Sequence, residues 1–350
     1  MAYTIPENKQ FIPADSGAFQ FVGRIDFDDP KRPVLIWPYS YIDTVFTGTS
    51  VGMVIKNIKM QEHTYMGAQV DGRMVTLDLG DEWEDKLWML AEDLEDKEHT
   101  LRIYKRMAAA NYVEFSGIVI DEGASVRNPE HKYDYKLEVY GDSVTAGEVT
   151  EALGYEGQCD PAHHSQFDNS HFSYAAMLAR KLNAEAHIMG QGGIALLDGT
   201  GYFCSDQLTG MLSCYDKLEY SPYKPRKDWD FSRFTPDAVI IAIGQNDHNP
   251  EPERIKQPEY RRMWKDNYIG MLNALREKYP AAKFVLILTV LGHDPTWDDA
   301  LDEIVAEVDS PDVTHFVFER CGKGTNGHPR ATEQEEMAGE LYRYFRAELM

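Results

Sequence analysis

Residues 135–148 read YKLEVYGDSVTAGE, and this stretch decides the fold of the second part of the chain. Tyr135 to Tyr140 has the composition of a buried strand, and a glycine, an aspartate and Ser143 follow it at once. The residues after Ser143 are small and compatible with a helix. Ser143 is either the cap of that helix or a hydroxyl held at a sharp turn facing a cleft, and the surrounding sequence must distinguish the two.

The segments around this stretch alternate between apolar strands and amphipathic helices. The predicted strands are 136–140, 185–189, 237–244, 283–290 and 313–320, and the predicted helices are 171–184, 260–280 and 331–350. In the last helix Met337, Leu341 and Phe345 recur every four residues and form one apolar stripe. Continuous apolar strands covered by such helices predict an α/β fold with a doubly wound parallel sheet buried on both faces.

The first third of the chain has a different pattern. Short runs rich in β-branched and aromatic residues, separated by Gly, Asp, Asn and Pro, predict strands at 18–27, 33–57, 65–79 and 99–107. The acidic, Trp-containing segment 81–100 is the exception, and we expect a short helix or a long loop there. We therefore predict an antiparallel β-sandwich over residues 1–130 and the α/β domain over residues 131–350.

Composition excludes several classes of protein. The formal net charge is −23, from 58 acidic and 35 basic residues, and such a surface repels the phosphates of nucleic acids. From the residues at its start and from its hydropathy we expect neither a signal peptide nor a membrane-spanning stretch. The cysteines lack a CxxC pair and are expected to be reduced: Cys159, Cys204, Cys214 and Cys321. We expect a soluble cytoplasmic protein that binds neither nucleic acid nor membrane.

Four groups of polar or glycine residues lie where the predicted strands end or the last helix begins. They are Gly141-Asp142-Ser143, then Gly190, Gly192 and Gly193, then Gly244, Asn246 and Asp247, and finally His328 before Pro329. Each alone has a structural explanation as a helix cap, a positive-φ turn or an Asx turn. Together they supply a serine nucleophile, a histidine base and oxyanion donors at the edge where α/β sheets bind ligands. The combination favours an active site.

This ordered set of a GDS motif, a glycine-rich block, GQND and an HP pair resembles the SGNH (GDSL-type) hydrolase superfamily. The earlier stretches FVGRIDF, IWPYSYIDTVFTGTSV, VDGR and HTLRIYKR resemble carbohydrate esterase family 2. The resemblance covers nearly the whole chain. It implies a jelly-roll β-sandwich followed by an SGNH hydrolase domain, and an enzyme that removes acetyl groups from plant polysaccharides and oligosaccharides.

The resemblance also implies roles for single residues. Ser143 corresponds to the nucleophile and His328 to the general base. The N–H groups of Ser143 and Gly193 and the side chain of Asn246 correspond to the oxyanion hole, with Gly192 as the alternative glycine under a one-residue shift. Asp142 is expected to hold the turn without taking part in the chemistry.

The sequence departs from the superfamily pattern at one position. Many members carry an Asp three residues before the histidine, and here that position is Thr325. We expect a Ser–His dyad whose imidazole is oriented by a backbone carbonyl of the Thr325–Gly327 segment, as in some relatives in the esterase family. A carboxylate from elsewhere in the fold is the open alternative.

The sequence also offers candidates for a metal site and for aromatic side chains that stack on a sugar. Residues that could bind zinc gather in CDPAHHSQFDNSH, namely Cys159, Asp160, His163, His164, Asp168 and His171, but they lack a metal-ligand spacing and are interpreted as a polar loop near the cleft. His293 and Asp294 are expected in a cleft-side loop without a metal. Trp229, Trp297, Tyr202 and Phe203 are candidates for stacking on sugar, while Trp264 and Trp37 are expected in the core.

The most concrete function is a serine acetylesterase that acts without a cofactor or metal. Its expected substrates are acetylated plant oligosaccharides such as mannan, glucomannan or xylan fragments, including 6-O-acetyl groups. A carbohydrate-binding protein with an inactive hydrolase half, and a short-chain lipid esterase or thioesterase, are the alternatives. Self-association into a homo-oligomer is left open.

Overall fold

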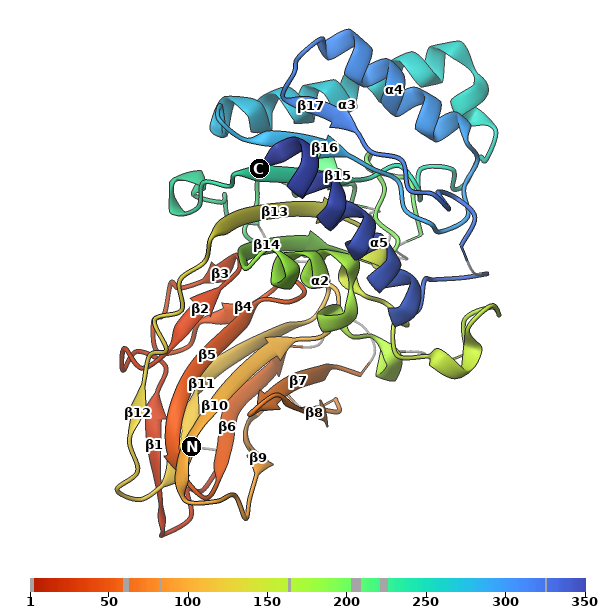
Figure 1. Cartoon of the computed structure of the whole chain (residues 1–350). Coiled ribbons are helices and arrows are strands. Elements are labelled where there is room, and N and C mark those ends of the chain that lie inside the picture. The colour runs from red at the N-terminus through yellow and green to blue at the C-terminus, as the bar shows by residue number, and fades with distance from the viewer. Residues whose placement is uncertain are drawn as a thin grey trace. The chain divides into compact units, whose positions relative to one another are not determined.

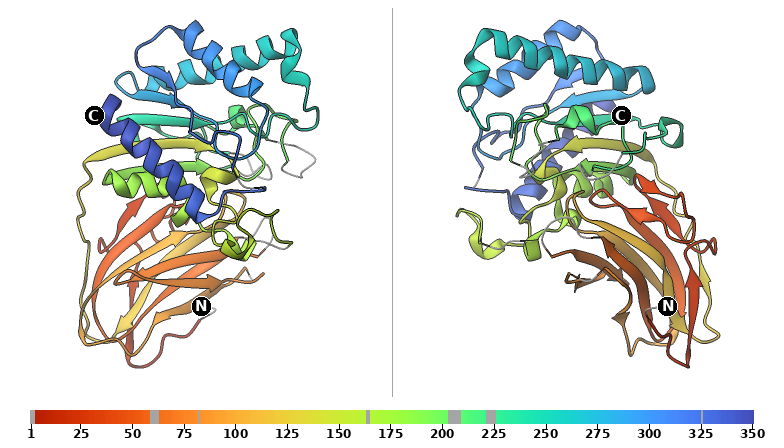
Figure 2. Two further views of the ribbon diagram at one scale, coloured as in Figure 1. Left: turned by 45° about the vertical axis from the view of Figure 1, so that its right-hand side comes forward. Right: turned by 180° about the vertical axis from the view of Figure 1, so that it is seen from behind.

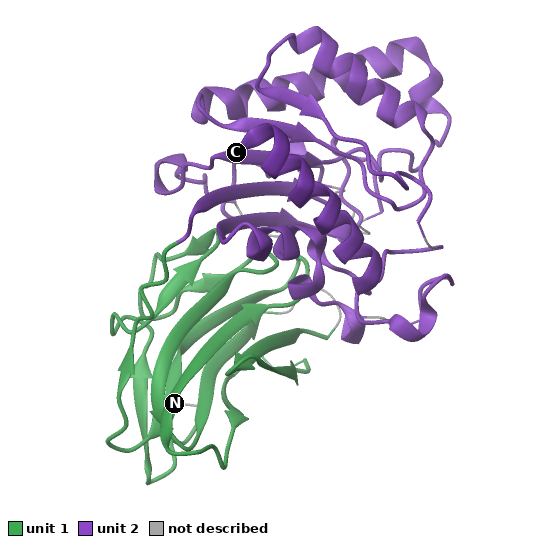
Figure 3. Cartoon of the chain, viewed as in Figure 1, with its two compact units in different colours: residues 1–132 green, residues 133–350 purple. Residues whose placement is uncertain are grey.

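The computed structural model describes residues 3–58, 63–81, 83–162, 165–202, 209–220, 226–324 and 326–350 (Figure 1). The chain divides into two compact units, residues 1–132 and 133–350 (Figure 3). The boundary predicted from the sequence lies between residues 130 and 131. No described helix is long and apolar enough to cross a membrane.

The first unit is an antiparallel β-rich domain made of two sheets. One sheet has the order β3 (Ile25–Asp26), β4 (Val34–Leu35), β11 (Tyr112–Asp121), β6 (Val51–Ile58) and β9 (Asp85–Ala91), with β1 (Lys9–Pro13) also on β11. The other has the order β12 (Val126–Arg127), β5 (Tyr41–Gly48), β10 (Lys97–Lys105), β7 (Tyr65–Val70) and β8 (Arg73–Asp78), with β2 (Gln20–Val22) on β5. Apolar residues of both sheets share one core, among them Ile42, Phe46, Met53, Ile103, Phe115 and Ile118. The predicted antiparallel domain is confirmed, and its jelly-roll connectivity stays a prediction.

The prediction of a helix or loop over 81–100 is wrong. Residues 85–91 form β9, which pairs antiparallel with β6 so that Trp88 lies opposite Met53, and β10 begins at Lys97. β9 is an edge strand. Edge strands commonly carry charged side chains because charge discourages pairing with another chain. The acidic residues that suggested a helix therefore fit a strand at the border of a sheet.

The second unit contains a five-stranded parallel sheet, as predicted. Its order is β14 (Ala184–Gly190), β13 (Tyr135–Gly141), β15 (Ala238–Ala242), β16 (Lys283–Leu286) and β17 (Val313–His315). Helices α2 (Tyr174–Lys181) and α5 (Ala331–Tyr344) lie on one face, and α3 (Pro258–Lys278) and α4 (Thr296–Val308) lie on the other (Figures 1 and 2). β16 and β17 are shorter than the sequence suggested.

Helix α5 is held to the sheet by the predicted apolar stripe. Met337, Leu341 and Phe345 are completely buried. Burial of each such side chain contributes about 1.5–3 kcal/mol. Gln334 adds two polar contacts, because its Oε1 accepts from the Tyr174 N–H at 2.8 Å and its Nε2 donates to the Val144 carbonyl at 3.2 Å. These contacts therefore fix the position of the beginning of α5 and of the segment just before it.

Trp297, a candidate for stacking on sugar, lies in the first turn of helix α4. Trp297, Leu301 and Ile304 are completely buried, at the spacing of one helix face. The Trp297 ring packs edge-on against Trp264, with ring centroids 5.2 Å apart. The burial of Trp297 in this helix face excludes it from contact with a ligand.

The turn after β13 is possible only with very small residues. A Cβ atom at Gly141 would lie 2.0 Å from Thr145 Oγ1, and one at Gly190 would lie 2.9 Å from the Ala146 nitrogen. The short helix α1 (Ser143–Ala146) therefore packs directly over the ends of β13 and β14. Any side chain at these two positions would push α1 away from the sheet.

We predict that Gly141→Ala displaces α1 and lowers the free energy of unfolding by about 1–3 kcal/mol, the usual range for overpacking. Urea unfolding at equilibrium measures the change. Gly270→Ala is the matched control, because Gly270 is an exposed residue of α3 with nothing within 4 Å of an added Cβ. The control should be neutral or stabilising, since Ala is the better helix former. Equal stability of Gly141→Ala and wild type would contradict the close packing.

Candidate active site

Ser143 is the first residue of α1, and Asp142 caps the helix. Asp142 Oδ1 accepts the Val144 N–H at 2.9 Å. Its Oδ2 accepts from Gln245 Nε2 at 2.7 Å and from Asn246 Nδ2 at 3.3 Å. Asp142 is buried, and burial raises its pKa despite these hydrogen bonds. The carboxylate thus joins the turn after β13 to the loop after β15.

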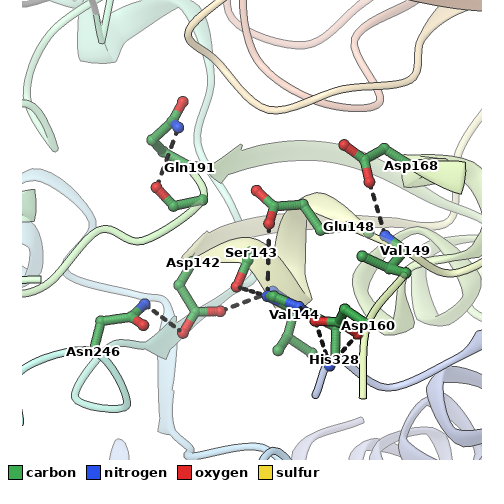
Figure 4. Close-up of polar contacts among 12 residues, drawn as sticks. Asp142, Ser143, Val144, Glu148, Val149, Asp160, Asp168, Gln191, Asn246 and His328 are labelled. Carbon is green, nitrogen blue, oxygen red and sulfur yellow. Dashed lines mark hydrogen bonds and ion pairs between the residues drawn. The ribbon is translucent and has the colours of Figure 1, made fainter. Parts of the chain in front are cut away.

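A continuous polar chain runs from Ser143 through His328 to Asp160 (Figure 4). Ser143 Oγ lies 2.8 Å from His328 Nε2, and His328 Nδ1 lies 2.7 Å from Asp160 Oδ2. The His328 backbone N–H also donates to Asp160 Oδ1 at 3.1 Å. This is the arrangement of a nucleophile, a base and a carboxylate that fixes the tautomer of the base.

The expectation of a Ser–His dyad oriented by a backbone carbonyl is wrong. The ring nitrogen that needs an acceptor has the carboxylate of Asp160, from a loop 168 residues earlier. Thr325 lies outside the described residues. Gly327 has φ of 83°, and a Cβ there would lie 2.5 Å from Asp160 Oδ1. The carboxylate therefore lies against the backbone that leads into His328.

Arg330 supports the carboxylate from the side away from the serine. Its guanidinium is fully buried and donates to Asp160 Oδ1 at 2.7 Å and to the His328 carbonyl. Burial opposes ionisation of Asp160, but hydrogen bonds from His328 and Arg330 lower its pKa to about 2. A buried charge is stable only when it is paired, so Asp160 and Arg330 require each other. Arg330 was not predicted as a site residue, although it follows the HP pair directly.

Glu148 is a second carboxylate near the imidazole. Its Oε2 lies 3.6 Å from His328 Nε2, on the serine side of the ring (Figure 4). Burial works against the protonated ring, yet the hydrogen bond to Asp160 and the charges of Glu148, Asp160 and Asp142 raise the pKa of His328 to about 9. The fraction of neutral imidazole, the form that acts as a base, therefore grows with pH through that region. Glu148 was not identified from the sequence.

The proposed oxyanion donors lie on loops that follow β13, β14 and β15. Within the described part of the chain, the N–H groups of Ser143 and Gly193 donate no hydrogen bond. Gly193 has φ of 70°, in a turn closed by the Ile194 N–H and the Gln191 carbonyl at 3.3 Å. Gly192, the alternative donor, packs against Glu148, because a Cβ there would lie 1.9 Å from Glu148 Oε1.

Asn246 reaches the same region through its amide. Nδ2 donates to the Ile194 carbonyl at 3.0 Å and to Asp142 Oδ2 at the longer distance of 3.3 Å. Binding an oxyanion would replace the longer contact. The neighbouring Asp247 is fully buried and fixes this loop by accepting from Trp264 Nε1 at 2.7 Å and from the Leu196 N–H at 3.0 Å. Burial raises the pKa of Asp247 to about 6.

Two of the predicted sugar-stacking residues are excluded by their burial. Trp229 is only 4% exposed and Trp297 is completely buried, so neither offers a ring face to a ligand. Tyr202 is 49% exposed, and its backbone N–H donates to the Gly193 carbonyl at 2.8 Å. Its hydroxyl lies 2.5 Å from His248 Nε2. Phe203 lies outside the described residues, and the core positions of Trp264 and Trp37 are confirmed.

The polar segment 159–171, where zinc ligands were considered as an alternative, provides the carboxylate that contacts His328. Asp160 binds His328, and Asp168 Oδ1 accepts the Val149 N–H at 2.8 Å. His163 and His164 lie outside the described residues. Cys159 and Cys321 are free thiols, and Cys204 is outside the described part.

Two family models match the sequence. The model described as carbohydrate esterase 2 N-terminal matches residues 21–129. The model of the GDSL-like lipase/acylhydrolase family matches residues 139–317, slightly more than half of the chain.

Curated relatives and a solved structure agree with these matches. Cellulase/esterase CelE of Acetivibrio thermocellus is 27% identical over 352 residues, which cover 96% of this chain and 40% of that protein. An acetylxylan esterase/glucomannan deacetylase of Cellvibrio japonicus is 26% identical over 213 residues, which cover 59% of this chain and 55% of that protein. The chain thus spans only part of the length of either relative.

A family two carbohydrate esterase from Clostridium thermocellum, solved in complex with cellohexaose, has the same fold. The TM-score is 0.78 at 24% identity, over 94% of this chain and 98% of that one. The chain therefore belongs to the GDSL-like lipase/acylhydrolase family of the SGNH superfamily and carries the N-terminal domain of carbohydrate esterase family 2.

Proposed function

We propose that the protein is a serine acetylesterase that removes O-acetyl groups from plant-derived oligosaccharides through an acyl-enzyme on Ser143. The observation that carries the proposal is the chain of 2.8 Å and 2.7 Å contacts that joins Ser143, His328 and Asp160. Mannan, glucomannan or xylan fragments, including 6-O-acetyl groups, are the proposed substrates. The names of the relatives, an acetylxylan esterase/glucomannan deacetylase and a cellulase/esterase, support this substrate class.

The proposed mechanism has two acyl-transfer steps. Neutral His328 takes the Ser143 proton as Oγ attacks the acetyl carbonyl, and the N–H groups of Ser143 and Gly193 together with Asn246 bind the oxyanion. The imidazolium, stabilised by Asp160, returns the proton to the departing sugar hydroxyl. Water then attacks the acetyl-serine with His328 as base, and acetate leaves. Tyr202 is the remaining candidate for stacking on the sugar.

The two alternative functions predict different reactions. A carbohydrate-binding protein with an inactive hydrolase half would hydrolyse no ester. A lipid esterase or thioesterase would prefer acyl chains longer than acetyl. The cytoplasmic location and self-association remain predictions from the sequence.

We expect the protein to hydrolyse p-nitrophenyl acetate much faster than the butyrate and octanoate esters, and to release acetate from acetylated xylan or mannan oligosaccharides. Ser143→Ala should lower kcat by at least about 10⁴-fold, because among the described residues only the Ser143 hydroxyl is aligned with His328 Nε2. Acetate release and p-nitrophenol absorbance measure the two activities. Absence of turnover in the wild type would favour the binding protein, a preference for octanoate would favour the lipid esterase, and activity in Ser143→Ala would exclude Ser143 as nucleophile.

Asp160→Asn tests which group orients the imidazole. We expect kcat to fall on the order of 10³–10⁴-fold, the scale of the same change in a serine protease triad, while KM changes little. Steady-state kinetics give both parameters, and circular dichroism verifies the fold. Asp168→Asn is a matched control in the same segment, since Asp168 holds the Val149 N–H and does not contact His328. A near-normal kcat in Asp160→Asn would contradict this role of Asp160 and would favour a Ser–His dyad.

The charges around His328 predict an alkaline pH profile. Because His328 must lose its proton to act, and its pKa is about 9, kcat/KM should rise with pH through that region. Removing the negative charge in Glu148→Gln favours the neutral imidazole of His328. The rise of kcat/KM with pH should therefore occur at lower pH in this variant.

Glu277→Gln is the control for this charge change. Glu277 is exposed near the end of α3, towards the amino ends of the strands and away from Ser143. The acidic side of the kcat/KM profile of Glu277→Gln should coincide with that of the wild type. An unmoved profile in Glu148→Gln would show that Glu148 does not contribute to the charge state of His328.

A further inference from the structure

The loops after β16 and β17 bring together three side chains that share no role in the acyl transfer. His293 comes from the first loop, Asp298 from the first turn of α4, and Cys321 from the segment that leads to His328. His293 Nε2 lies 3.0 Å from Asp298 Oδ2, Cys321 Sγ lies 3.4 Å from Asp298 Oδ1, and Sγ and Nε2 are 3.8 Å apart. A nitrogen, an oxygen and a sulfur atom therefore face one small volume.

The hydrogen bonds of this cluster leave an excess of acceptors. His293 Nδ1 lies 2.7 Å from the Leu291 carbonyl, which can only accept, so Nδ1 carries a proton. A neutral imidazole then presents a lone pair at Nε2 to the Asp298 carboxylate. The Cys321 thiol has one proton, yet it faces the Leu288 carbonyl at 3.4 Å as well as Asp298. A cation between these atoms would satisfy the lone pairs.

We propose that His293, Asp298 and Cys321 form a zinc site that joins the loops after β16 and β17. Zinc binds His nitrogen, carboxylate oxygen and Cys sulfur at about 2.0–2.3 Å, and tetrahedral geometry then separates ligand atoms by roughly 3.3–3.6 Å. In the structure Nε2 and Sγ are 3.8 Å apart and contact different oxygens of Asp298, at 3.0 Å and 3.4 Å, so the ligand atoms lie near the spacing that zinc requires. The contact between Nδ1 and a backbone carbonyl is the usual way in which a protein orients a metal-binding histidine. The thiolate ligand favours zinc over magnesium or calcium.

A second imidazole and the backbone complete the surroundings of the site. His315 Nε2 lies 3.7 Å from Asp298 Oδ1. The His315 side chain is only 2% exposed, and its Nε2 atom makes no hydrogen bond within the described part of the chain. His315 Nδ1 is oriented by Asp302 Oδ1 at 2.8 Å. Gly322 has φ of 64° and donates to the Thr289 carbonyl at 3.0 Å, which brings Cys321 close to the His293 ring. A water molecule or His315 is available as the fourth ligand.

The proposal revises the expectation that His293 lies in a loop without a metal. The zinc ion would take no part in the reaction at Ser143. It would stabilise the start of the segment that ends at His328, because binding to the folded chain alone adds to its stability. Failure of the zinc proposal would leave the esterase proposal unchanged, since the two have separate residues and separate measurements.

The test uses the untagged full chain, freed of metal by a chelator that is then removed. Isothermal titration with Zn²⁺ should show one-to-one binding and a higher Tm on saturation. Cys321→Ser and His293→Gln should weaken binding by more than the roughly 10–100-fold that loss of an outer-shell partner costs. Cys159→Ser, which changes another free thiol, is the matched control and should bind as the wild type does.

Co²⁺ tests the sulfur ligand without any substitution. A thiolate-to-cobalt charge-transfer band should appear in the wild type and in Cys159→Ser. The zinc site is excluded if the wild type binds no zinc, if both ligand variants bind it as tightly as the wild type, or if bound cobalt shows no such band.

Discussion

The register of the parallel sheet is the constraint on which the rest of the active site depends. Gly141 at the end of β13 lies opposite Gly190 of β14 and Ala242 of β15, so these three strands end together. The turn that carries Ser143, the glycine turn and the loop that carries Asn246 therefore begin at the same edge. A register shift of one residue in β14 or β15 would reverse the faces of its side chains and displace the loop that follows. Glycine is required at Gly141 and Gly190 because α1 lies directly on the strand ends and leaves no room for a Cβ atom.

Orientation and basicity of His328 are coupled through the same charges. Asp160 fixes the ring at 2.7 Å and also stabilises its protonated form, and Glu148 adds negative charge 3.6 Å from the other ring nitrogen. Arg330 compensates the partly buried carboxylate of Asp160 from the far side. Because the groups that surround the imidazole are negatively charged carboxylates, the contacts that orient the ring also raise its pKa against the opposing effect of burial.

The segment that bears His328 is anchored at both ends. On the helix side, Arg330 binds Asp160, and Gln334 ties α5 to α1 and α2. On the strand side, Cys321 meets His293 and Asp298, and the backbone of Gly322 binds Thr289. A base must lie within hydrogen-bonding distance of its nucleophile, so the position of a loop residue depends on such contacts.

The sequence by itself determined the parallel sheet, the antiparallel first unit, the family, and the serine and histidine that the geometry joins. These features are encoded in apolar periodicity and short motifs, which involve residues close together in the chain. Only the tertiary structure decided that Asp160 orients His328, that Arg330 pairs with Asp160, and that Glu148 faces the ring. It also placed Trp229 and Trp297 in the core, and turned an acidic segment into the edge strand β9. The physical reason is that burial and charge pairing arise between segments far apart in sequence; Asp160 and His328 are separated by 168 residues and have no pattern in common.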